Sequence, residues 1–262
     1  MTVHQEDHPH PEWRVYDRSR QQKWRIAILH EDGALLALNK PAGLPVIPER
    51  WHPDWPCLKS IATEQLGARI WVVHRLDAGT SGVVLFAKTA EAHHALCEQF
   101  TQRRVEKVYW AIVQGNVETE EHIIQMPLAP HPKKPGMMIV HESGKAAATT
   151  IRVLERFRHF SLVEARPLTG RQHQIRVHLQ AWGHPLVVDP LYARTEALFL
   201  SALKANYRAK GEELPLLGRL ALHAVALRLA HPLRREPFTI HAALPKDFNA
   251  TVKNLRKYDV VC

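Results

Sequence analysis

Turn residues divide the chain into many short apolar runs, and this pattern limits the possible folds more than any other feature. The runs at 25–30 and 34–40 flank Glu-Asp-Gly, which is a typical hairpin signal. Further runs of strand length lie at 71–74, 82–88, 107–115, 120–126, 136–142, 146–157, 160–167, 219–230 and 237–243. Because short links join most consecutive runs, we expect their pairing to be mainly antiparallel.

Helical signals are fewer than strand signals. Residues 57–67 predict a short helix, and Thr89 is a suitable N-cap for a second helix that extends to about Arg103. Further helices are predicted from a Thr-x-x-Gln capping box at Thr169, within 195–217, and from about residue 245. The expected fold class is therefore α+β, with a mainly antiparallel mixed sheet and flanking helices around a central cleft.

Composition and charge indicate one globular unit. Residues 1–23 are polar with scattered prolines and are expected to form a flexible arm before a single domain over 24–262. The formal net charge of +9 suggests a polyanionic partner, although solubility alone would also explain it. The three cysteines lack metal spacing, and no apolar run approaches the ~20 residues of a membrane span. We expect a soluble cytoplasmic protein with no membrane partner.

The stretch VVHRLDAGTSGVVLFAK (72–88) places charges of both signs between two apolar runs. Taken alone, Asp77 is explained by a turn in which its carboxylate accepts hydrogen bonds from backbone amides. Arg75 lies two positions earlier, so both side chains of an extended chain would face the same side. The flanking valines indicate burial, and a buried charge requires a partner.

A second polar cluster is found in RPLTGRQHQIRVHLQAWGHP (166–185), where arginines and histidines crowd a predicted helix. Gln172, His173 and Arg176 lie at helical spacing on one polar face. A solvated helix face would explain them, but such a face also suits phosphate contacts or the bidentate binding of a carboxylate. The residues alone leave both interpretations open.

The run KVYWAIVQG (107–115) contains Tyr109 as a third candidate site residue. A core aromatic side chain is the simpler interpretation of a single tyrosine in such a run. A tyrosine can also stack on a nucleic-acid base and offer its hydroxyl group, so both interpretations stay open at this point.

Several chemistries lack the motifs that they need. Despite eighteen histidines, the chain has no His-Glu-x-x-His and no Cys-x-x-Cys. It also has no Gly-x-Gly-x-x-Gly, no phosphate loop and no Gly-x-Ser-x-Gly elbow. We therefore expect neither a metal site nor a nucleotide cofactor.

HRLDAGTSG (74–82) resembles the His-Arg-Leu-Asp-x-x-Thr-Ser-Gly signature of the RluA-type pseudouridine synthases. Other segments resemble further motifs of that family in the same order, namely LALNKPAGLPV (36–46), KVYWAIVQG, GKAAATTIRVL (144–154), RPLTGRQHQIRVHLQAWGHP and RLALHAVALRLAHP (219–232). The resemblance implies the catalytic fold of these synthases. It also implies an isomerase that converts uridine in RNA to pseudouridine without a redox cofactor, metal or nucleotide.

The resemblance also implies roles for the residues described above. Asp77 matches the catalytic carboxylate, which either attacks C1′ as a nucleophile or removes the C2′ proton as a base. Arg176 matches its ion-pair partner, which favours the ionised aspartate that both roles need. Tyr109 matches the active-site tyrosine, which is expected to stack on the target uracil.

The expected partner is structured RNA, a stem-loop of rRNA or tRNA from which the target base must be flipped out. Arg75 matches the arginine expected to occupy the space that the base leaves. Further RNA contacts are predicted for His74, Lys107, Arg171 and His173. The alternatives are a non-catalytic RNA-binding protein on the same fold and a metal-dependent hydrolase that uses the histidines.

The chain departs from the family pattern in three places. About thirty residues precede the first motif, too few for the S4-type module that the family often carries, so we expect a monomer that binds RNA through its catalytic domain. In HPLVVDPLYA (184–193), Val188 stands next to Asp189 where a similar family segment has glycine. The segment 195–217 matches no family motif and is interpreted as an insertion that touches substrate.

Overall fold

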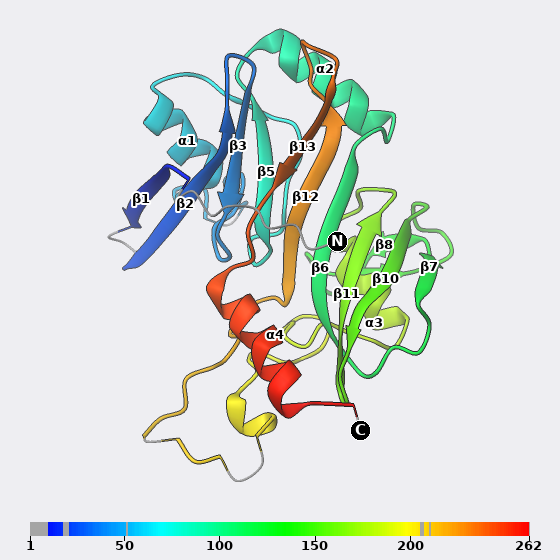
Figure 1. The fold of residues 1–262 in the computed structure, drawn as a ribbon. Helices are drawn as coiled ribbons and strands as arrows, with labels where there is room; N and C mark the ends of the chain where they lie inside the picture. The colour runs from blue at the N-terminus through cyan, green and yellow to red at the C-terminus, as the bar shows by residue number, and fades with distance from the viewer. Residues whose placement is uncertain (1–9, 18–20, 51, 205–206, 210, 262) are drawn as a thin grey trace.

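The computed structural model describes residues 10–17, 21–50, 52–204, 207–209 and 211–261. Within these ranges, eleven strands form one sheet that extends across Figure 1. Nine of them follow one another in the order β1 (Glu12–Asp17), β2 (Gln22–Glu31), β3 (Leu35–Lys40), β5 (Ser81–Ala87), β12 (Leu222–Ala230), β6 (Glu106–Gln114), β11 (Phe160–Pro167), β10 (Ala148–Arg156) and β7 (Glu121–Gln125). The other two are β13 (Pro237–His241), which pairs with β12, and β4 (Trp71–Val72), which pairs with β5.

Neighbouring strands of this sheet pair antiparallel, except that β5 and β12 are parallel. The expected mainly antiparallel mixed sheet is therefore confirmed. The predicted hairpin is also confirmed, because β2 and β3 pair antiparallel around the Glu-Asp-Gly turn. A separate two-stranded sheet joins β9 (Met138–Val140) to β8 (Leu128–Pro130), and β8 was not predicted from the sequence.

The helices are distributed around the sheet (Figure 1). They bury its apolar side chains in separate clusters. These helices are α1 (Leu58–Leu66), α2 (Ala90–Thr101), α3 (Gln174–Ala181) and α4 (Lys246–Tyr258). Buried side chains of α1 pack with those of β2 and β3, and buried side chains of α2 pack with those of β3, β5 and β12. Side chains of α3 and α4 share a third cluster with β6, β10 and β11. Apolar burial on this scale is the main term that stabilises the fold.

The parallel contact between β5 and β12 depends on a glycine. Gly82 pairs with Ala224 and has a φ of +117°, a conformation that side chains disfavour. A Cβ at this position would collide with the carbonyl oxygen of Ala224. Next to it, Ser81 and His223 are joined by a hydrogen bond of 2.8 Å between Oγ and Nδ1. This junction fixes the start of β5, directly after the loop that carries Asp77.

The predicted helix over 195–217 is wrong. Its described residues contain one short 3₁₀ turn, Leu200–Ala202, and otherwise irregular chain. The backbone of Leu198 exchanges hydrogen bonds with Leu216 and Leu217, so the segment folds back on itself instead of continuing as a helix. Residues 205–206 and 210 of this segment lie outside the described residues.

The N-terminal segment differs from the flexible arm that its polar sequence suggested. Residues Glu12–Asp17 form β1, which pairs antiparallel with β2 at the edge of the sheet. Exposed and partly buried side chains alternate along β1, and two of the partly buried ones, Trp13 and Val15, pack against the core. Residues 1–9 and 18–20 of the expected arm lie outside the described residues. The division into an arm and one catalytic domain stays a prediction.

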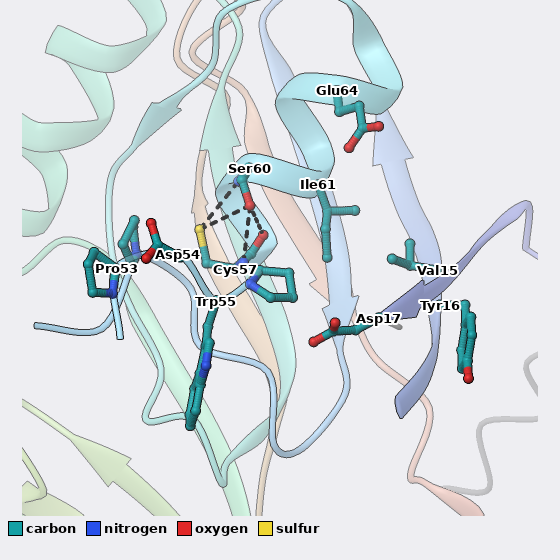
Figure 2. Close-up of a pocket in the computed structure, with 12 residues that line it drawn as sticks. Val15, Tyr16, Asp17, Pro53, Asp54, Trp55, Cys57, Ser60, Ile61 and Glu64 are labelled. Carbon is teal, nitrogen blue, oxygen red and sulfur yellow. Dashed lines mark hydrogen bonds between the residues drawn. The ribbon is translucent and has the colours of Figure 1, made fainter. Parts of the chain in front are cut away.

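A smaller cavity of about 400 Å³ lies between β1 and α1 (Figure 2). Cys57 stands at its wall and caps α1, because its Sγ accepts a hydrogen bond from the N–H of Ser60 at 3.4 Å. The Ser60 hydroxyl in turn accepts the N–H of Cys57 at 3.1 Å, which makes the cap reciprocal. The predicted helix over 57–67 is thus confirmed.

Among the described helices, none combines the length and apolar character that crossing a bilayer requires.

Candidate active site

A cleft of about 1310 Å³ lies beside the loop between β4 and β5. It is lined by all the residues that the sequence suggested, namely His74, Arg75, Asp77, Lys107, Tyr109, Arg171, His173 and Arg176. Its basic lining residues are Arg50, Arg75, Arg103, Lys107, Arg171 and Arg176, whereas its acidic ones are Glu49 and Asp77. Such an excess of positive charge in a concave surface attracts a polyanion.

Asp77 forms an ion pair with Arg176, as predicted. Nη1 of Arg176 donates to Oδ2 of Asp77 at 3.1 Å. Nε and Nη2 of Arg176 donate to the two carboxylate oxygens of Asp189 at 2.8 and 2.9 Å. The side chain of Asp189 is 1% exposed, whereas that of Asp77 is 28% exposed. The buried, bidentate pair therefore fixes the guanidinium group and directs its remaining nitrogen toward the accessible carboxylate.

The loop around Asp189 is fixed by burial and hydrogen bonds, although Val188 stands where the family segment has glycine. Val188 is fully buried, and its carbonyl oxygen accepts the N–H of Ala221 at 3.2 Å. Oδ1 of Asp189 also accepts the backbone N–H groups of Leu191 and Tyr192 at 2.9 and 3.1 Å. The valine thus packs inside the core without displacing the carboxylate that holds Arg176.

Helix α3, which carries Arg176, begins at Gln174 and not near Thr169 as the capping box predicted. The Thr169 hydroxyl donates to Oε1 of Gln174 at 2.6 Å, and the N–H of Arg171 donates to the same oxygen at 3.0 Å. His173 has a φ of 53°, which is left-handed and cannot continue a helix. The helix therefore starts after His173, and Gln174 replaces Gln172 as the side chain that closes the turn.

His173 lies between the carboxylate of Asp77 and the hydroxyl group of Tyr192. Its Nε2 is 3.8 Å from Oδ2 of Asp77, and its Nδ1 is 2.8 Å from the Tyr192 oxygen. Burial lowers the pKa of His173, and the nearby Asp77 charge opposes that effect. Tyr192 was not among the residues predicted from the sequence, although its ring also lies 4.9 Å from the guanidinium carbon of Arg176.

Tyr109 lies on β6 and combines both interpretations that its sequence left open. Its ring packs against two of the apolar clusters, and the residue also lines the cleft. Burial raises the pKa of the Tyr109 phenol, and the charge of Asp77 raises it further. The phenol is therefore neutral at physiological pH and keeps its proton.

His74 and Lys107 are held by contacts within the protein. Nε2 of His74 accepts the backbone N–H of Leu85 on β5 at 2.9 Å, and burial lowers the pKa of this ring to about 3. Nζ of Lys107 donates to the Thr169 carbonyl at 3.0 Å, and burial lowers its pKa to about 8, with Arg103 adding to the effect. His74 therefore supports β5 as a neutral ring, whereas Lys107 keeps two N–H bonds for a ligand.

Of the predicted RNA contacts, Arg75 is exposed, and Arg171 is partly exposed. Among the described residues, Arg75 makes neither a hydrogen bond nor an ion pair, and its side chain is exposed on the cleft. Nε of Arg171 donates to the Ala146 carbonyl at 3.2 Å, which leaves its other nitrogens available.

Other histidines serve as internal hydrogen-bonding groups. Fully buried His178 bonds Thr149 and the Met126 carbonyl, and fully buried His223 bonds Ser81 and the Ala242 carbonyl. Within the described part of the chain, no group of three or more His, Cys, Asp or Glu side chains is placed to bind a metal.

Comparison with known proteins identifies the family of this chain. Residues 34–181 match the RNA pseudouridylate synthase family. Ribosomal large subunit pseudouridine synthase D of Haemophilus ducreyi is 35% identical over 250 residues, which cover 91% of this chain and 73% of that protein. The chain belongs to the RNA pseudouridylate synthase family. The expected fold, family and enzyme class of this synthase are therefore confirmed.

The synthase is also similar to a second bacterial enzyme and to a solved human structure. The dual-specificity RNA pseudouridine synthase RluA of Vibrio vulnificus is 39% identical over 211 residues, which cover 78% of each chain. Among solved structures, Human RNA Pseudouridylate Synthase Domain Containing 4 matches with a TM-score of 0.69 at 28% identity. That match covers 87% of this chain and 92% of the human chain.

Lys40 supports the active site of the synthase and was missed by sequence reasoning. It ends β3, is fully buried, and its Nζ donates to the carbonyl oxygens of Pro41, Leu44 and Ala78 at 2.9, 2.6 and 2.9 Å. Burial lowers the pKa of Lys40 to about 7, and Asp77 opposes this effect. One amine thus ties the proline-rich loop to the residue that follows Asp77. The Asn-Lys-Pro motif around it was the only sequence signal.

Replacing Lys40 with methionine is expected to lower the free energy of unfolding by about 2–4 kcal/mol, because three buried carbonyl oxygens lose their donor. The difference should grow as pH rises above 7. The folded-state pKa is about 7 and the ordinary value is 10.5, so in this window residue 40 of the unfolded wild type binds more protons than it does in the folded state. This contribution to stability rises with pH in the wild type and is absent from the variant. The gain is at most about 1.4 kcal/mol per pH unit.

Urea unfolding of both proteins at pH 7 and pH 9 measures this difference. The exposed Lys59→Met provides the matched control, which should unfold like the wild type at both pH values. If the stability difference between the wild type and Lys40→Met became smaller at pH 9, the lowered pKa of Lys40 would be contradicted.

Proposed function

We propose that the synthase isomerises a uridine in a stem-loop of rRNA or tRNA, with Asp77 as the catalytic carboxylate. The observation that carries the proposal is the asymmetry of this carboxylate. Oδ2 is held by Arg176, which is itself fixed by the buried Asp189. Oδ1 has no hydrogen-bond partner among the described residues, and Asp77 lines a cleft large enough for a nucleotide. A cytoplasmic location and a monomeric state, both expected from the sequence, complete the proposal.

The reaction balances without any external reagent. The bond between N1 and C1′ breaks, the uracil turns, and C5 forms a new bond to C1′. The proton that C5 loses is matched by the proton that N1 gains, so nothing is oxidised or reduced. Asp77 either bonds to C1′ for the time that the base turns or removes the C2′ proton. Both roles require an ionised carboxylate, and Arg176 lies 3.1 Å from it as its ion-pair partner.

The cleft also provides groups for a flipped nucleotide. Extruding a base from a duplex costs a few kcal/mol of stacking and pairing, which favours a target in a loop or bulge. We assign Tyr109 to stack on the extruded uracil, because its neutral ring lies on the cleft within the electrostatic range of Asp77. Arg75 is exposed on the same cleft and is assigned to fill the space that the base leaves. Lys107 and Arg171 are assigned to the RNA backbone.

Mapping pseudouridine across cellular RNA with and without this gene tests the proposal. We expect discrete positions in rRNA or tRNA to lose pseudouridine when the gene is absent and to regain it when the wild-type gene is restored. An unchanged map would overturn the assignment. If the purified protein bound these RNAs without modifying them, a non-catalytic RNA-binding role would replace it.

A further inference from the structure

We propose that His173 and Tyr192 are positioning residues that orient Asp77, and that His173 does not contribute RNA affinity as its place in a basic segment suggested. This inference rests on the proposed function, in which Asp77 is the catalytic carboxylate. Three independent features carry it: the backbone conformation of His173, the hydrogen bonds that fix its ring, and the one-sided surroundings of Asp77.

The backbone conformation of His173 is energetically unfavourable. Its φ of 53° is left-handed, a region that residues other than glycine rarely adopt, although Asn, Asp and His are several-fold enriched there. The side chain is only 13% exposed, so it is turned into the protein wall. Strain of this kind persists where surrounding contacts hold it, and it clusters at functional sites.

Tyr192 determines which ring nitrogen of His173 carries the proton. The backbone N–H of Met138 on β9 donates to the Tyr192 oxygen at 2.9 Å. The proton of the phenol is then free to point at Nδ1 of His173, 2.8 Å away. With Nδ1 as an acceptor, the neutral imidazole carries its proton on Nε2. The N–H bond that faces Asp77 is therefore set by a tyrosine on the other side of the ring.

The side-chain nitrogens of Arg176 and His173 that approach the Asp77 carboxylate lie at the same oxygen. Arg176 donates to Oδ2 at 3.1 Å, and Nε2 of His173 lies 3.8 Å from the same oxygen. The second distance is too long for a hydrogen bond, but a bond dipole in a partly buried site still favours the nearer oxygen. The two N–H groups thus favour one orientation of the carboxylate, with Oδ2 toward α3 and Oδ1 left for the ribose.

Three variants separate positioning from RNA contact. Tyr192→Phe keeps the ring beneath Arg176 but removes the hydroxyl that fixes the tautomer. His173→Asn suits the left-handed backbone but is too short to reach Asp77. His173→Gln restores an amide N–H at about the reach of Nε2. We expect the single-turnover rate constant to fall about tenfold in the first two variants and to recover in part in the third, with unchanged RNA dissociation constants.

Nitrogen NMR of the histidine rings reports which ring nitrogen of His173 carries the proton. A purely structural role of Tyr192 would leave this tautomer unchanged. The wild type should show His173 protonated at Nε2, and Tyr192→Phe should lose that preference while keeping its fold by circular dichroism. Tyr258→Phe, on α4 and outside the residues that line the cleft, is the matched control and should retain wild-type rate and tautomer.

Two outcomes would overturn the proposal. A weaker RNA dissociation constant with an unchanged single-turnover rate in His173→Asn would make His173 an RNA contact. A wild-type rate and an unchanged tautomer in Tyr192→Phe would show that Tyr192 does not set the tautomer of His173. Either result is compatible with an inactive Asp77→Asn, so it leaves the proposed function standing. An active Asp77→Asn would instead overturn the proposed function itself.

Discussion

Asp77→Asn is expected to reduce the single-turnover rate of pseudouridine formation by more than about a thousandfold, as loss of an essential catalytic group does in other enzymes. The amide has the same shape, and its oxygen can still accept the Arg176 N–H that now reaches Oδ2. It provides neither a nucleophile for C1′ nor a base for the C2′ proton. To measure the rate, RNA from cells lacking the gene is incubated with each protein. Chromatography of its nucleotides then quantifies the pseudouridine formed.

The fold and the RNA affinity of Asp77→Asn should be retained. Arg176 keeps its bidentate contact with Asp189, so no buried charge loses its partner. Thermal unfolding and RNA titration therefore serve as controls for the loss of activity. A rate within about tenfold of the wild type would show that another group performs the chemistry.

Arg176→Met is expected to affect both stability and activity. It leaves the 1%-exposed carboxylate of Asp189 without its cation, and breaking a buried pair in this way costs about 3–5 kcal/mol. It also removes the N–H that orients Asp77, so the single-turnover rate should fall by at least about a hundredfold. Urea unfolding and single-turnover assays measure the two effects separately.

The double variant Arg176→Met with Asp189→Asn distinguishes the two effects. Neutralising residue 189 removes the unpaired charge while Oδ1 can still accept the N–H groups of Leu191 and Tyr192. Part of the lost stability should return, by about 1 kcal/mol or more, because the two sites are in contact and their effects do not add. Activity should stay low because Asp77 still lacks its partner. Recovery of activity together with stability would mean that Arg176 acts only through the fold.

Local patterns in the sequence were sufficient for most elements, whereas the principal residues of the cleft followed from the resemblance to the family motifs. Alternating apolar runs predicted the hairpin of β2 and β3, and Thr89 was correctly read as a cap, since its hydroxyl accepts the N–H of Ala92 at 3.1 Å. Asp77 and Arg176 form the pair that the resemblance implied, although they lie far apart in sequence. That pairing followed from the family motifs, because spacing alone had suggested Arg75 as the neighbour of Asp77.

What the sequence did not predict depends on long-range contacts. Lys40 reads as the end of a strand, and its three carbonyl acceptors exist only once the loops fold around it. Tyr192 looks like a loop residue until β9 offers it the Met138 N–H. His74 looks like a polar site residue, but its ring holds the backbone of β5. The 195–217 segment has helical propensity, which the backbone pairing of Leu198 overrides.

Release of tritium from RNA labelled at C5 of uridine tests most directly that this synthase isomerises uridine through Asp77. Each turnover must break one C5–H bond, so one tritium should pass to water for each pseudouridine formed. We predict release by the wild type on RNA from cells lacking the gene, and none above background by Asp77→Asn, which still binds that RNA. Equal release by both proteins, or no release by a wild type that binds the RNA, would contradict the account.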